Sequence, residues 1–240
     1  MEFLKLTSVE LEALRLSLWI SGWAVLGSLV PGILVAWVLA RKQFPGKVLL
    51  DGLVHLPLVV PPVVTGYTLL LLMGRRGILG KWLYDLTGIV FAFNWKGAAL
   101  ASGVMAFPLL VRAVRLSIEN VDQGLEQAAR TLGAGPIDLF FTVTLPLIFP
   151  GIITGIILAF ARSLSEFGAT ITFVSNIPGQ TQTLPLALYT LTQVPDGEAG
   201  ALRLCIISVV VALAALVVSE LLAGRMERRM RGKNRSHVGH

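Results

Sequence analysis

Charged residues are scarce in this chain of 240 residues. Asp, Glu, Lys and Arg make up 14% of it, whereas an ordinary globular protein has about 25%. Hydrophobic residues account for 55%, and the mean hydropathy is +0.76. Several stretches of about 20 residues are almost free of charge, which is the length needed to cross a bilayer. Because lipid cannot hydrogen-bond an open backbone, the sequence predicts an all-α integral membrane protein.

Cysteine, histidine clusters and a secretion signal are also missing. Cys205 is the single cysteine, which excludes an internal disulfide. His55, His237 and His240 do not stand at metal-ligand spacing, so no metal site is expected. The N-terminus has no basic segment followed by a small-residue cleavage site, so we expect no cleavable signal peptide.

No nucleotide-binding motif is present. The run GRRGILGKW at residues 74–82 resembles a Walker A sequence, but it has five residues between its outer glycines and Trp82 instead of Ser or Thr after Lys81. No nucleophile–base arrangement is visible either. The sequence therefore predicts a chain that is not an enzyme and binds no cofactor of its own.

Five apolar segments have the length of membrane helices. The second contains Pro57, Pro61 and Pro62, which should kink it. A sixth, N-terminal helix is a weaker alternative, because residues 1–15 are short and charged for a span. The expected spans are residues 16–40, 49–73, 97–116, 147–167 and 201–223, within a single domain of 1–240 whose core is about 12–223.

Lysine and arginine near the span ends predict the orientation. One set of loops, which includes the basic tail at residues 224–240, holds 12 of these residues, and the opposite set holds 7. This bias places the C-terminus and residues 122–146 in the cytoplasm and the N-terminus outside. The net charge of +6 is explained by this topology and by lipid headgroups, so nucleic acid is not an expected partner.

Residues 122–146 form the longest polar interruption in the middle of the chain. Leu125, Ala128, Ala129 and Leu132 fall on one face of a helix that Asn120 or Asp122 can cap. Residues 133–136, Gly-Ala-Gly-Pro, should end this helix, and Pro136 should begin a second short one. The apolar stripe suits either a groove on a partner protein or the membrane surface.

The same loop resembles the EAA signature of ABC importer permeases. Gln127-Ala128-Ala129, Gly133 and the run Val143 to Pro146 reproduce its spacing; Gln127 replaces the usual Glu, and Val143 the usual Ile. In that family the loop is a coupling helix that docks on an ATPase subunit. The resemblance implies a coupling role for Glu126, Gln127, Ala128, Ala129, Gly133, Leu145 and Pro146.

The resemblance extends over nearly the whole chain. Residues 44–80, 125–135 and 158–191 are similar to the permeases of molybdate ABC importers, which implies a type I importer transmembrane domain in the bacterial plasma (inner) membrane. The implied partners are a second copy, two ABC ATPase subunits that use ATP and Mg, and an extracytoplasmic molybdate-binding protein. Sulfate, thiosulfate or tungstate uptake remains open.

A self-contained secondary anion transporter or channel is an alternative of another class. It would need intramembrane carboxylates for ion coupling. Asp51, Glu166 and Glu220 are few and lie close to span ends. A membrane-embedded enzyme is a weaker alternative, because no catalytic arrangement is visible.

Arg162 and Glu166 lie four residues apart near the end of the fourth span, hence on one helix face. They form either a structural ion pair or part of an outer gate, with nearby hydroxyls as donors to an oxyanion. Residues 176–185 are expected to form an external loop that dips toward the membrane. The candidates for the pathway are Arg162, Ser163, Ser165, Glu166, Thr170 and Thr172, with Pro61 and Pro62 on the second span.

Overall fold

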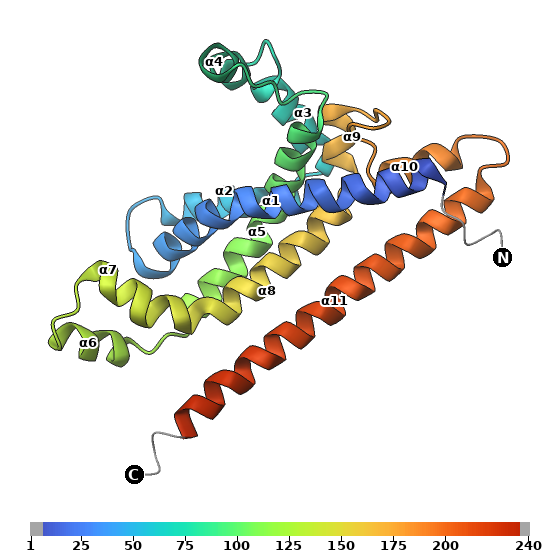
Figure 1. Cartoon of the computed structure of the whole chain (residues 1–240). Helices are drawn as coiled ribbons and strands as arrows, with labels where there is room; N and C mark the ends of the chain where they lie inside the picture. Colours follow the sequence, from blue (N-terminus) through green and yellow to red (C-terminus); the bar gives the residue numbers. More distant parts are fainter. Residues whose placement is uncertain (1–6, 236–240) are drawn as a thin grey trace.

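The structure is a computed structural model that describes residues 7–235, with side chains up to Val218 and at Leu221. Every regular element in this part of the chain is a helix (Figure 1). The side chains of the basic tail, residues 224–240, lie outside the part of the chain whose side chains are described. The helices are α1 (Ser8–Arg41), α2 (Lys47–Val59), α3 (Pro62–Met73), α4 (Ile78–Thr87), α5 (Trp95–Glu119), α6 (Gln123–Thr131), α7 (Pro136–Leu139), η2 (Phe140–Thr144), α8 (Leu145–Leu164), α9 (Gly168–Val174), α10 (Leu184–Thr192) and α11 (Glu198–Arg235).

The packed centre of the molecule consists of α1, α5 and α8 (Figure 1). Leu110, Val114 and Ile118 of α5 are fully buried against Leu39 of α1 and Ile148 of α8. Small residues let these helices approach: a Cβ added at Gly151 or Gly155 of α8 would meet Ser117 at 2.2 Å or Leu110 at 2.9 Å. The two glycines of α8 therefore serve helix packing.

The five expected spans are present if the bent pair α2–α3 counts as one span. Within residues 7–235, four helices are long and apolar enough to cross a bilayer, and the α2–α3 pair bends by 116° at its break. The break falls at Pro61 and Pro62, which both lack a backbone N–H, and α3 then packs against α9. The alternative of a sixth helix concerned residues 1–15; of these, residues 8–15 form the first turns of α1, capped by Thr7 and Glu10, and residues 1–6 lie outside the described part of the chain.

The expected second short helix of residues 122–146 is not separate from the following span. α7 continues through the π-helical turn η2 into α8, so residues Pro136–Leu164 form one long helix. Pro146 has no N–H for the carbonyl of Thr142, and its ring crowds that carbonyl. A widened turn just before the proline relieves this conflict.

The segment between α9 and α10 is folded into the protein. Thr181, Gln182 and Thr183 are buried, and the Asn176 side chain donates a hydrogen bond to the Thr190 hydroxyl at 2.7 Å. The expected external loop at residues 176–185 is thus a packed polar connection. The last helix, α11, is different, because only 6% of its most apolar stretch is buried, which leaves it free to contact lipid or other subunits.

Candidate functional site: coupling loop and translocation pathway

The polar loop folds as its sequence predicts around α6. The Asp122 carboxylate accepts a hydrogen bond from the Gly124 N–H at 2.8 Å and so caps the helix. Gly133 has φ +92°, a left-handed conformation that glycine adopts easily and that ends the helix. Pro136 then begins α7. The turn between α6 and α7 therefore depends on Gly133.

The two faces of α6 have different surroundings. The apolar stripe is turned outward: Leu125 is 51% exposed and Leu132 is 89% exposed. The opposite face is polar and lines a cavity against α1 and η2; it carries Gln123, Glu126, Gln127 and Arg130. The predicted coupling residues are thus divided, with Ala128 and Ala129 on the stripe and Glu126 and Gln127 on the cavity side.

Glu126 fixes the loop to the rest of the protein. Its carboxylate accepts hydrogen bonds from Arg41 at the end of α1, at 2.7 Å, and from the Thr144 hydroxyl, at 3.0 Å. Thr144 is the last residue of the π-helical turn and precedes Leu145 and Pro146. Glu126 therefore joins three segments, a role that the sequence does not show because Arg41 lies 85 positions away in the chain.

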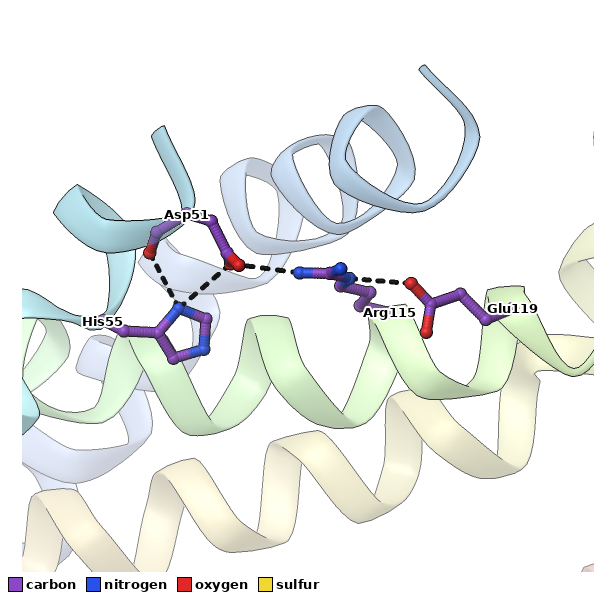
Figure 2. Close-up of polar contacts among 4 residues, drawn as sticks. All are labelled: Asp51, His55, Arg115 and Glu119. Carbon is purple, nitrogen blue, oxygen red and sulfur yellow. Dashed lines mark hydrogen bonds and ion pairs between the residues drawn. The ribbon is translucent and has the colours of Figure 1, made fainter. Parts of the chain in front are cut away.

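A second polar network joins α2 to the last turns of α5 (Figure 2). Arg115 donates to Glu119 at 2.8 Å, one turn along α5, and to Asp51 of α2 at 3.0 Å. The ring of His55 lies 3.2 Å from the same Asp51 carboxylate. These four residues tie α2 to the last turn of α5, immediately before α6. This link could not be predicted from the sequence, because the i,i+4 spacing of Arg115 and Glu119 does not indicate a partner on α2.

The break between α2 and α3 lies against the break between α8 and α9. α3 packs on α9, where a Cβ added at Gly66 would lie 2.4 Å from the carbonyl oxygen of Ala169. One added at Gly168 would lie 2.8 Å from Pro62. The structure thus brings the Pro61–Pro62 break next to the start of α9. Irregular backbone inside a membrane is tolerated where protein or a water-filled cavity surrounds it, and transporters place substrate sites at such broken helices.

Arg162 and Glu166 form a close ion pair at the end of α8. Their side chains approach to 2.6 Å, with Glu166 only 1% exposed and Arg162 24% exposed. The second oxygen of Glu166 accepts a hydrogen bond from the Ala169 N–H at 2.8 Å. The carboxylate therefore holds both sides of the break between α8 and α9, which supports the structural role for the pair.

The four predicted hydroxyls fall into two groups. Ser165 and Thr172 donate to backbone carbonyls of Arg162 and Gly168. Ser163 and Thr170 are buried, and their hydroxyl oxygens have no hydrogen-bond partner among the residues that the structure describes. Buried hydroxyls normally have partners, so these two are the better candidates for contact with substrate or water.

Comparison with known proteins identifies the family. Residues 32–232 match the family described as "Binding-protein-dependent transport system inner membrane component". The molybdenum transport system permease protein ModB of Escherichia coli (strain K12) is 63% identical over 228 residues, which cover 95% of this chain and 99% of the relative. The sulfate transport system permease protein CysW of Synechococcus elongatus is 40% identical over 223 residues, covering 92% and 76%.

The fold agrees with this assignment. A bacterial alginate ABC transporter, solved in complex with an alginate pentasaccharide-bound periplasmic protein, has a chain that superposes with a TM-score of 0.70 at 19% identity. The match covers 93% of this chain and 80% of that chain. Together with the apolar helices, these findings show a multi-pass inner-membrane protein with the type I ABC importer fold. The chain belongs to the binding-protein-dependent transport system inner membrane components, among the molybdenum transport permeases of that family.

Proposed function

We propose that this chain forms the translocation pathway of an ATP-driven molybdate importer. The observation that carries the proposal is the likeness to the molybdenum permease over almost the whole chain. The site is compatible with an oxyanion, because the ion pair with Glu166 neutralises Arg162, and the buried hydroxyls of Ser163 and Thr170 have no hydrogen-bond partner among the described residues. Few positive charges favour release of a dianion, whereas a cage of arginines would retain it.

We propose that two copies of the chain assemble with two ABC ATPase subunits and an extracytoplasmic molybdate-binding protein. The exposed apolar stripe of α6 supports docking on an ATPase, since a helix-in-groove contact uses such a face. ATP and Mg would be used by the ATPase pair. Closure of that pair on ATP would draw the two loops together and open the pathway outward, and hydrolysis would reset it.

We propose that the C-terminus and the loop around α6 face the cytoplasm and the N-terminus faces outside. The excess of lysine and arginine in the corresponding loops supports this orientation. Labelling of single cysteines in intact cells measures it. With Cys205 replaced by alanine, a cysteine at exposed Asp138, which is not on the apolar stripe, should react only after the membrane is made permeable; reaction in intact cells would reverse the assignment.

Transport by reconstituted vesicles tests the function. Vesicles that hold this chain, the ATPase and the binding protein should accumulate labelled molybdate only with ATP, and excess tungstate should compete more strongly than excess sulfate. Vesicles that hold this chain alone should accumulate nothing. Transport without the ATPase would favour a secondary transporter, and dominant competition by sulfate would favour the sulfate permeases as the relevant relatives.

Gly133→Trp should separate ATP hydrolysis from transport. The glycine has φ +92°, a left-handed conformation that a β-carbon disfavours by about 1–2 kcal/mol, and the turn lies at the end of the proposed docking helix. We expect normal membrane insertion, continued ATP hydrolysis by the complex, and molybdate uptake reduced by roughly tenfold or more, the effect of about 1.4 kcal/mol on one coupled step.

Gly133→Asn is the matched control, because asparagine tolerates the left-handed conformation and should retain most of the uptake. Normal uptake by Gly133→Trp would show that this turn has no coupling role.

A further inference from the structure

A cavity of about 630 Å³ lies between the end of α1, the polar face of α6 and the start of the long helix α7–η2–α8. The walls of this cavity change from apolar to charged along α1. Ile33, Leu34 and Trp37 supply apolar surface within the span, and Arg41 and Lys42 follow at the end of the helix. Pro136, Ile137, Phe140 and Phe141 complete the apolar wall on the other side.

The charged end of this cavity is positive. Arg41, Lys42 and Arg130 line it together with a single carboxylate, that of Glu126. Glu126 forms an ion pair with Arg41, so Lys42 and Arg130 are the cations left in excess. The Lys42 ammonium lies 5.4 Å from the ring centre of Trp37, which places its charge at the boundary between the apolar and polar walls.

The cavity and the apolar stripe of α6 are on opposite faces of that helix. Gln123, Glu126, Gln127 and Arg130 recur at helical spacing on the cavity side. Leu125 and Leu132 of the stripe are exposed on the other side. A ligand in the cavity would therefore leave the stripe free for the ATPase, and both could be bound at once.

We propose that this cavity binds one anionic phospholipid from the leaflet that faces the loop. The phosphate lies at Lys42 and Arg130, and an acyl chain runs along Leu34 and Phe141 into the bilayer. A phospholipid matches the gradient from apolar to cationic along α1, and basic pockets between membrane helices are known to take anionic headgroups. Which leaflet supplies the lipid depends on the proposed orientation of the chain, whereas binding of the lipid to this cavity does not.

Retention of phosphatidylglycerol by the assembled transporter tests this site. Native mass spectrometry of complexes from nanodiscs with equal phosphatidylglycerol and phosphatidylcholine should show one tightly retained phosphatidylglycerol per copy of this chain. The double variant Lys42→Glu/Arg130→Glu should bind it at least about tenfold more weakly, since each cation near a membrane surface contributes substantially to anionic-lipid binding.

Lys47→Glu is the matched control, because Lys47 begins α2 in the same loop but does not line the cavity. Equal loss of lipid in this control would show a general charge effect and would overturn the proposal, as would full retention by the double variant. Displacement of the lipid by millimolar inorganic phosphate or molybdate would assign the cavity to a free anion instead.

The acyl chain has a separate readout at Trp37. Phosphatidylglycerol with brominated chains should quench a fluorescence component that is absent from Trp37→Phe, and brominated phosphatidylcholine should quench it less. Equal quenching by the two lipids would mean that bulk lipid, not a bound anionic one, contacts this wall. Neither the lipid-retention experiment nor the quenching experiment measures transport, so both results are independent of whether molybdate is the substrate.

Discussion

Glu166→Ala should be among the most damaging single substitutions in the chain. It leaves Arg162 without its partner at 2.6 Å and removes the acceptor for the Ala169 N–H at a site where the carboxylate is 1% exposed. Loss of one partner from a buried ion pair costs about 3–5 kcal/mol. We expect a marked fall in the thermal stability of the purified complex and loss of molybdate uptake.

Two further variants separate the structural role of the pair from a gating role. Glu166→Gln keeps an acceptor for the Ala169 N–H and should be less damaging than alanine. Arg162→Met/Glu166→Gln removes both charges and should recover most of the stability. If this double variant also transports normally, the pair is structural only. If it is stable but passes substrate without ATP, Arg162 and Glu166 belong to the gate.

Gly66→Ala should force α3 away from α9. The new methyl group would lie 2.4 Å from the carbonyl oxygen of Ala169 and 2.8 Å from its Cα, and backbone atoms cannot move aside as a flexible side chain can. Overpacking of this kind typically costs about 1–3 kcal/mol. We expect molybdate uptake to fall to background while ATP hydrolysis by the complex continues, because the contact is far along the chain from α6.

Gly52→Ala provides the comparison for this experiment. Gly52 lies in α2, and a Cβ there would have no atom within 4 Å, so the protein should transport normally. Uptake and thermal stability of both variants, measured in the same vesicles, separate a local clash from a general effect of losing a glycine. Normal uptake by Gly66→Ala would show that α3 and α9 need not stay in close contact.

Local patterns predicted much of the architecture. Apolar length alone located the spans, and the cap at Asp122 and the stop at Gly133 located α6, because these features depend on neighbouring residues. The prolines at 61 and 62 predicted a kink but not a bend of 116°, since that angle depends on what α3 packs against. Likewise, the separate second short helix was wrong because the whole stretch from Pro136 can continue as one helix through a π-helical turn.

Contacts between residues far apart in the chain could not be predicted from the sequence. The partner of Glu126 is 85 positions away at Arg41, and that of Arg115 is 64 positions away at Asp51. By contrast, the i,i+4 spacing of Arg162 and Glu166 predicted their pairing, although Glu166 lies two residues beyond the end of α8 and not on the same helix face. The sequence contains only a weak indication that Gly66 packs closely against another segment, namely that it is a glycine inside an apolar helix. The roles assigned to these residues in coupling and translocation remain predictions.

The ion pair between Glu10 and Arg203 has a consequence for the order in which the chain is made. Glu10 is at the start of α1, where it is 3% exposed, and its 2.9 Å partner is 193 positions later on α11. Helices α1, α5 and α8 can pack while synthesis continues, but this carboxylate lacks its arginine until the last helix emerges. Before Arg203 is made, the Glu10 carboxylate keeps the hydrogen bond from the Thr7 N–H, and the ion pair that joins the start of α1 to α11 is therefore one of the last contacts to form.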